Sequence, residues 1–156
     1  MPLFGRREPS VPIDPAFETA IVASTDGDRA STRETLGRNF AAIQQLMAPD
    51  EKPVCVCWYN QRVTSNMLLV VTNRRSVTLH KSHVIQQLGH DEVAETTSWS
   101  MTNADGTLVR IESERAQLDY REDDPDRMKH IIQVEDVTPR VAAAISAAIA
   151  PYLGAH

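Results

Sequence analysis

Short hydrophobic segments separated by polar turns occupy the middle of the chain. Residues 54–59 and 67–72 are almost continuously apolar and rich in β-branched and aromatic side chains, which favours buried interior strands over helices. Residues 76–81 alternate apolar and polar positions more regularly. The intervening residues 73–75 are too few to cross a sheet, so an antiparallel hairpin is expected there, and residues 60–66 form a polar loop.

Alternation along these strands assigns each side chain to one of two faces, because neighbouring side chains of an extended chain point in opposite directions. The first strand is expected to separate Val54, Val56 and Trp58 from Cys55, Cys57 and Tyr59. The third strand is expected to point Val77 and Leu79 inward and Ser76, Thr78 and His80 outward.

Four more segments carry strand patterns. They are residues 92–101, 107–112, 116–121 and 128–134, and an Asn-Ala-Asp-Gly turn separates the first two. Residues 82–91 fit either a brief strand or one helical turn and are interpreted as a connection. The pattern therefore predicts seven antiparallel strands.

Three segments have the apolar spacing of helices. A short helix is expected over residues 14–24, starting on an Asp-Pro pair. Ser31 and Glu34 form a capping-box pattern ahead of an amphipathic helix that Pro49 ends. The last helix starts on a Thr-Pro pair, and its apolar stripe consists of Val141, Ile145, Ile149 and Tyr152. This helix is expected to close one open end of the strand assembly.

The length and composition suit one compact core. The chain has 156 residues, of which 42% are hydrophobic, and this fits one domain with short attachments. Residues 1–30 are expected to form a flexible arm with a short helix, residues 31–49 the amphipathic helix, and residues 50–156 the main domain. Three placements of that helix stay open: over a sheet face, in a groove of the domain, or on a second subunit.

Charge and cysteine content exclude several classes of protein. The net charge of −5 argues against a nucleic-acid sheath or a general affinity for anionic lipid, so any anion site must be local. Cys55 and Cys57 are adjacent positions on one strand face and poorly placed for a disulfide, which predicts free thiols in a reducing compartment. No stretch resembles a signal peptide or approaches about twenty apolar residues, so a cytoplasmic protein is expected.

The order of the elements resembles the pleckstrin-homology-like (PH-like) superfold. The segment MLLVVTNRRSVTLHK is similar to the apolar strand, Thr-Asn/Asp-x-Arg, apolar strand signature of bacterial PH domains, and MAPDEKPVCV is similar to the usual entry into the first strand. The resemblance covers about residues 50–153. It implies an α+β, mainly antiparallel β fold: a seven-stranded barrel or sandwich capped by the C-terminal helix, with an N-terminal helical extension. A small cystatin-like or lipocalin-like cup is the alternative.

Two groups of side chains include metal-ligand types but lack the spacing of metal sites. A zinc site would use Cys55, Cys57, His80, His83 and His90. A Cys-x-Cys pair on a buried strand lacks the turn that zinc sites use. A cation loop would use Glu122, Asp123, Asp124 and Asp126. That loop lacks the central Gly and closing Glu of an EF-hand. Without a nucleophile elbow or a Gly-rich phosphate loop either, no metal, cofactor or catalytic residue is expected, and the chain is predicted not to be an enzyme.

Four basic residues are the candidate anion or lipid contacts: Arg62, Arg74, Arg75 and Lys81. In eukaryotic PH-like domains several basic residues near the first hairpin loop hold a phosphoinositide head group, and here that loop offers Arg62 alone. Arg74 and Arg75 are adjacent in a tight turn and point apart, which disfavours a shared ligand.

The expected function is that of a non-catalytic intracellular binding or assembly module. The resemblance implies a protein or peptide partner, held along an exposed sheet edge or beside the C-terminal helix, because edge pairing needs only unpaired backbone groups. The alternative is a membrane-surface or anionic-lipid-binding domain. A ligand-binding cup or an enzyme ranks third, a nucleic-acid partner is disfavoured, and assembly into a small homo-oligomer stays open.

Overall fold

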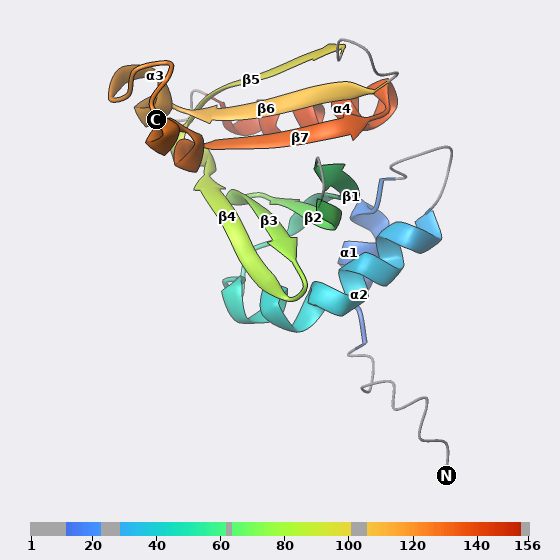
Figure 1. Ribbon diagram of the computed structural model, residues 1–156. Helices are drawn as coiled ribbons and strands as arrows, with labels where there is room; N and C mark the ends of the chain where they lie inside the picture. The colour runs from blue at the N-terminus through green and yellow to red at the C-terminus, as the bar shows by residue number, and fades with distance from the viewer. Residues whose placement is uncertain (1–11, 23–28, 62–63, 101–105, 154–156) are drawn as a thin grey trace.

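The computed structural model describes residues 12–22, 29–61, 64–100 and 106–153. Helices α1 (Pro15–Ala20) and α2 (Arg29–Leu46) precede seven strands. Helix α4 (Pro139–Ile149) and the 3-10 turn η3 (Ala150–Tyr152) follow the strands. The fold is α+β, with two antiparallel sheets and a C-terminal helix (Figure 1).

The seven strands form two sheets. The first sheet contains, in spatial order, β1 (Pro53–Gln61), β2 (Thr64–Thr72), β3 (Arg75–His80) and β4 (His83–Gly89). The second contains β5 (Val93–Ser100), β6 (Thr107–Ser113) and β7 (Ile131–Val137). Each neighbouring pair is antiparallel. The prediction was a barrel or a sandwich, and a closed barrel is not seen in the described residues. The chain leaves the first sheet through the 3-10 turn η1 (His90–Glu92) and starts a separate sheet.

The first sheet lies between two hydrophobic layers. Its Val56, Leu68, Val70, Val77 and Leu79 share one cluster with Phe17, Leu36, Phe40 and Ile43 of the two N-terminal helices. Its Cys55, Cys57, Tyr59, Met67, Leu69 and Val71 share another with the second sheet and α4. The alternation predicted for the first strand is thus confirmed at positions 55 to 59, and α2 covers a face of the first sheet in cis.

Helix α4 buries its apolar stripe against both sheets. The Thr138 hydroxyl oxygen accepts a hydrogen bond from the Val141 N–H at 3.2 Å, so the predicted N-cap is confirmed. Val141, Ile145 and Ile149 are fully buried in the layer that also holds residues of β1 and β6. In Figure 1 the helix runs behind the second sheet.

The interpretation of residues 82–91 as a connection is wrong, since they contain β4. The turn that precedes this strand consists of Lys81 and Ser82, whose φ angles of 47° and 68° lie in the left-handed region. Hairpin turns of this kind usually carry Gly, Asn or Asp. The sequence therefore lacks a turn signal at the point where β3 ends and β4 begins.

The strand predicted at residues 116–121 is also wrong, because helix α3 (Glu114–Leu118) starts there. The Ser113 hydroxyl oxygen accepts from the Ala116 N–H at 3.1 Å and caps this helix. The 3-10 helix η2 (Pro125–His130) likewise replaces the start of the strand predicted at 128–134. Here the Asp124 carboxylate accepts from the Asp126 N–H at 2.9 Å, and β7 begins only at Ile131.

Two expectations about exposure and position also fail. Ser76 and Thr78 are buried, although the alternation points them outward, because the second sheet and its loops cover that face. Strand β1 is an outer strand of its sheet and not an interior one. Its outer side is nevertheless covered, since the Val22 N–H donates to the Val56 carbonyl at 2.8 Å and Ile21 forms a parallel bridge to Val56.

Candidate functional site

The basic residues predicted as anion contacts do not converge on one site. Arg62 lies outside the described residues. Arg74 forms an ion pair with Asp50, and Arg75 forms one with Glu51, both at the start of β3. Lys81 follows the opposite end of β3, and the six residues of this strand separate its two ends by roughly 17 Å. A single ligand bound by all of these residues is therefore not supported.

Glu51 is a buried carboxylate held by several donors. Its oxygens accept from the Thr72 hydroxyl at 2.6 Å, from the Ala48 N–H at 3.2 Å and from two guanidinium nitrogens of Arg75 at 2.9 and 3.1 Å. Burial raises the pKa of this carboxyl, but the hydrogen bonds from Thr72, Ala48 and Arg75 outweigh burial and leave the pKa lowered. The group is therefore an ionised structural anchor between the β1 entry and the β2–β3 turn.

His90 occupies a second buried polar position beside this anchor. Its Nε2 lies 2.7 Å from the Thr72 carbonyl oxygen, so Nε2–H is the donor of this hydrogen bond. Tyr152 of η3 stacks on the imidazole with a centroid distance of 4.7 Å and an interplanar angle of 6°. Burial lowers the pKa of His90, because the protonated ring loses more hydration energy than its interactions with Thr72, Asp91 and Glu51 restore.

The hollow around His90 has a volume of about 350 Å³ and is lined by Asn73, Arg74, His90, Asp91 and Tyr152. Arg74 in this wall is already paired with Asp50. The imidazole is committed to a backbone carbonyl and a ring stack. These contacts give Arg74, His90 and Tyr152 a structural role, and the residues that line the hollow include no Ser, Thr, Cys or Lys.

The lowered pKa of His90 leads to a prediction for stability against pH. A base whose pKa is lower in the folded than in the unfolded chain stabilises the fold above about pH 6.5, and this stabilisation is lost as the pH falls toward the folded-state value. We expect the unfolding free energy, measured by urea denaturation between pH 7.5 and 5, to fall less steeply in His90→Gln than in the wild type. His83→Gln, at an exposed position, is the control and should keep the wild-type slope. Equal slopes in all three proteins would contradict this role of His90.

The metal-ligand candidates are placed away from any shared centre. Cys55 and Cys57 are free and buried in the layer between the first sheet and α4. The hydrogen bond to Cys55, together with burial, raises the pKa of the Cys57 thiol well above its ordinary value, which disfavours the thiolate that binds metals. Within the described part of the chain, no group of three or more His, Cys, Asp or Glu side chains could hold a metal ion.

The outer edges of the two sheets differ in how they are covered. The segment at Ile21 and Val22 pairs along β1, and β7 runs beside β1. Strand β5 is an outer strand that carries the exposed carboxylate of Glu95, a charge that discourages pairing with another chain. The outer side of β4, here called the β4 edge, has no Asp, Glu, Lys, Arg or Pro within residues 83–89. It is the described edge that best suits an added strand.

Apolar side chains are exposed on the β4 edge. Val84 is 39% exposed and Ile85 is 56% exposed, fractions well above those of a core strand. Ile85 is the extra residue where the pairing with β3 shifts register, so it lies in a bulge. A bulge can re-aim a side chain at the rim of a sheet, and here the re-aimed side chain is a large aliphatic one.

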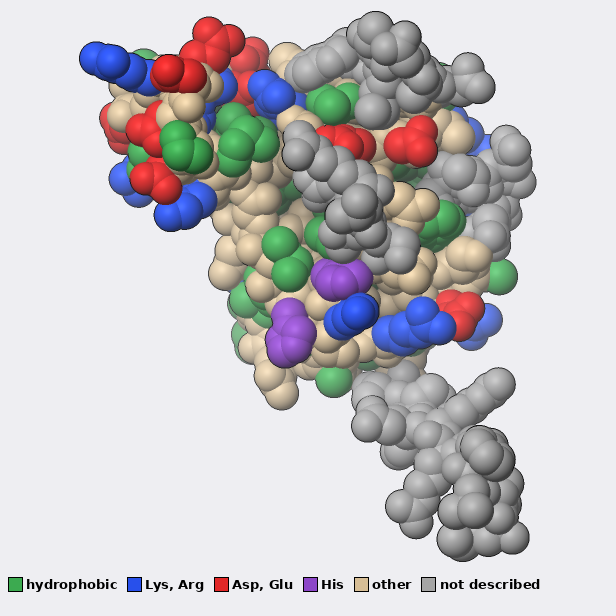
Figure 2. Space-filling view, in the orientation of Figure 1, with side chains coloured by type: hydrophobic (Ala, Val, Ile, Leu, Met, Phe, Trp, Pro, Cys, Tyr) green, Lys and Arg blue, Asp and Glu red, His purple; other side chains and the backbone are tan. Residues whose placement is uncertain are grey.

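A hollow of about 410 Å³ adjoins this edge. Its lining residues are Ile85, Gln86, Gln87, Met128 and Lys129, and it is called the edge hollow below. The Gln86 side-chain amide joins β4 to η2 and to the start of β7, donating to the Met128 carbonyl at 2.8 Å and to the Ile131 carbonyl at 2.5 Å. In Figure 2 the outline of the molecule is indented below the lobe that α3 and η2 form. The edge hollow thus combines an open strand edge with the exposed apolar side chains of Ile85 and Met128.

Sequence reasoning weighed His83 as a metal ligand but assigned no function to residues 84–89, because it treated them as part of a connection. The available signal was the apolar set of Val84, Ile85 and Leu88, which the structure separates into two exposed residues and one buried residue.

None of the helices in the described residues is long and apolar enough to cross a bilayer. Searches against models of protein families and against curated proteins give no match for this sequence.

Proposed function

We propose that this chain is a non-catalytic intracellular binding module of PH-like architecture, which accepts an extended segment of a partner protein along the β4 edge. The observation that carries the proposal is an open, uncharged outer strand that exposes Ile85 next to the edge hollow. A strand added there would gain backbone hydrogen bonds from the edge and specificity from the hollow.

The PH-like assignment is supported by the order of elements. A four-stranded antiparallel sheet is followed by a three-stranded one, and a C-terminal helix then packs on both. The segment from Leu69 to Leu79, which carries the resemblance, forms the β2–β3 hairpin. A cytoplasmic location is proposed on the two adjacent free thiols, which suit a reducing compartment.

Membrane-surface binding has weaker support than strand binding. Arg74 and Arg75 each have a carboxylate partner within the chain, so less positive charge is available to an anionic lipid than the sequence implies. Lys81 keeps its exposed position.

The test is selection of binding peptides from a random octapeptide library by the immobilised full chain, followed by amide chemical-shift mapping. We expect the shifts to move along β4 and η2. Ile85→Lys should weaken binding of the selected peptides roughly tenfold to a hundredfold, because a buried aliphatic contact contributes about 1.5–3 kcal/mol and a lysine blunts a strand edge.

The matched control is Leu118→Lys, which makes the same type of change at an exposed position of α3 that does not line the edge hollow. It should leave the affinity unchanged. Shifts centred on β5 or α2, or an equal loss of affinity in both variants, would refute the β4 edge as the binding site.

A further inference from the structure

We infer that the segment accepted by the β4 edge carries carboxylate side chains at the end that lies against the β3–β4 turn, and an apolar side chain at the edge hollow. This inference rests on the proposed function and adds to it the chemistry and polarity of the partner segment. It follows from a difference in charge between the surroundings of the two ends of β4, a strand that itself has no Asp, Glu, Lys or Arg.

The β3–β4 turn holds a strained conformation that displays a lysine. Lys81 and Ser82 both have positive φ, a backbone conformation that is unfavourable for L residues other than Gly. Two contacts to α2 offset this cost: the Ser82 N–H donates to the Asn39 side-chain oxygen at 2.8 Å, and the Ser82 hydroxyl donates to the Arg38 carbonyl at 2.7 Å. The turn is thereby fixed on the helix, with the Lys81 side chain exposed.

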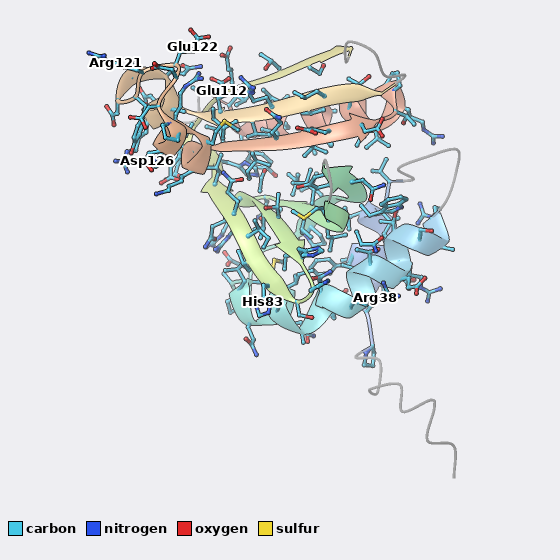
Figure 3. The ribbon with its side chains drawn as sticks, viewed as in Figure 1. Arg38, His83, Glu112, Arg121, Glu122 and Asp126 are labelled. Atoms are coloured by element: carbon cyan, nitrogen blue, oxygen red, sulfur yellow. The ribbon has the colours of Figure 1, made fainter. Side chains whose placement is uncertain are left out.

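Positive charge and imidazole groups gather at this end of the β4 edge. Figure 3 places Arg38 and His83 near the same end of the molecule, and Figure 2 shows histidines beside Lys and Arg on the lower part of that face. Arg38 is paired with Glu34, at 2.6 Å, in an exposed i,i+4 pair. No carboxylate of the described residues forms an ion pair with Lys81, so its ammonium group is the one best placed to meet an incoming carboxylate.

A lysine that already has a carboxylate partner borders the other end of the edge. Lys129, in the wall of the edge hollow, is paired at 3.0 Å with Asp126 of η2. Figure 3 shows Asp126 on the lower side of the α3–η2 lobe, with Arg121 and Glu122 on its upper side. A second negative charge brought to this end would meet the Asp126 carboxylate, whereas an apolar side chain would cover Ile85 and Met128, which is 43% exposed. Complementary charge therefore sets which end of the bound segment carries the carboxylates and which end carries the apolar side chain.

Synthetic octapeptides can test this inference on the full chain. The probes share a Val-Ile core and carry two Glu or two Lys residues at either the N-terminal or the C-terminal end, because the strand could add in either direction. We expect at least one Glu probe to bind about fivefold more tightly than its Lys counterpart in low salt, and this preference to shrink in 0.5 M NaCl.

Two variants of the turn separate charge from structure. Lys81→Asn removes the charge while keeping a residue that tolerates positive φ, and it should abolish the preference for Glu without weakening the Lys probes. Lys81→Arg keeps the charge and should keep the preference.

The outcomes distinguish the inference from the proposed function. Equal binding of the Glu and Lys probes, mapped to β4, would overturn the inference and leave the strand-binding function standing. Binding of no probe would overturn both. A dimer in sedimentation analysis that becomes a monomer in Ile85→Lys would show a second copy of the chain on this edge, and it would overturn the inference as well.

Discussion

Replacing Glu51 with Ala should lower the free energy of unfolding by about 3 kcal/mol, a large share of the stability of a domain this size. The side chain of Glu51 is fully buried and accepts hydrogen bonds from Thr72, Ala48 and Arg75. Its removal leaves the Thr72 hydroxyl buried with one partner fewer, and it leaves Arg75, whose side chain is only 25% exposed, without a counter-charge. Breaking one side of a buried pair costs more than the pair itself contributes.

Asp50→Ala provides the matched control for this measurement. Asp50 is the neighbouring residue and also pairs with an arginine, but both members of the Asp50–Arg74 pair are exposed. An exposed pair contributes about 0–1 kcal/mol, so urea denaturation should show little change in this variant. Equal losses in the two variants would mean that Glu51 does not act through its buried contacts.

The pH dependence of Glu51→Ala gives an independent check. A carboxyl whose pKa is lowered by folding contributes stability above its unfolded value of about 4.5, and this contribution is lost as the pH falls through the folded-state value. The gap between the wild type and Glu51→Ala should therefore narrow when the unfolding free energy is measured at pH values below about 4.5.

Local pattern was sufficient to predict the elements whose packing follows from their own sequence. Residues of the β1–β2–β3 meander were predicted as strands because apolar and β-branched side chains dominate them, and Cys55 and Cys57 were assigned to the correct shared face. Helix α4 was predicted from its Thr-Pro start and its apolar stripe. Both faces of β1 and β2 are buried, which makes their sequences almost continuously apolar. One face of α4 is buried, which gives its sequence an apolar stripe at helical spacing.

Elements with little buried surface could not be predicted in this way. Strand β4 exposes Val84 and Ile85 and is preceded by a turn of Lys81 and Ser82, so neither its alternation nor its boundary is visible locally. Its existence depends on pairing with β3 and on the Asn39 contact from α2. The reverse error occurs at α3, where Ala116 and Leu118 imitate alternation although Ser113 caps a helix.

The candidate site was predicted in part for the same reason. Arg75 was a reasonable anion contact by residue type, but the carboxylate that occupies it, Glu51, is 24 positions earlier in the chain. Lys81 remains a candidate contact for an anionic group, because the β3–β4 turn holds its side chain in an exposed position. Ile85 was missed, because an exposed apolar residue becomes informative only when the structure shows it on an open edge.

Phe40→Ala should cost about 3–5 kcal/mol and destabilise the whole protein, not α2 alone. Phe40 is 1% exposed and packs edge-on against Phe17 of α1, with a centroid distance of 5.1 Å and an interplanar angle of 87°. Its cluster includes Val56, Leu68 and Val70 of the first sheet, which α2 shields from water. Loss of the ring would leave a cavity between helix and sheet that rigid strands cannot close.

This prediction decides whether residues 31–49 are an attachment or part of the core. If α2 were an independent extension, Phe40→Ala would melt the helix and leave a second, unshifted transition for the sheets. If the sheet needs the helix to bury Val56, Leu68 and Val70, far-ultraviolet circular dichroism and tryptophan fluorescence should report one coincident transition at lower urea concentration. Gln44→Ala, at an exposed position of the same helix, should leave the transition in place. We expect the single shifted transition, because the face that α2 covers is as apolar as the one that α4 covers, and neither can be left in water.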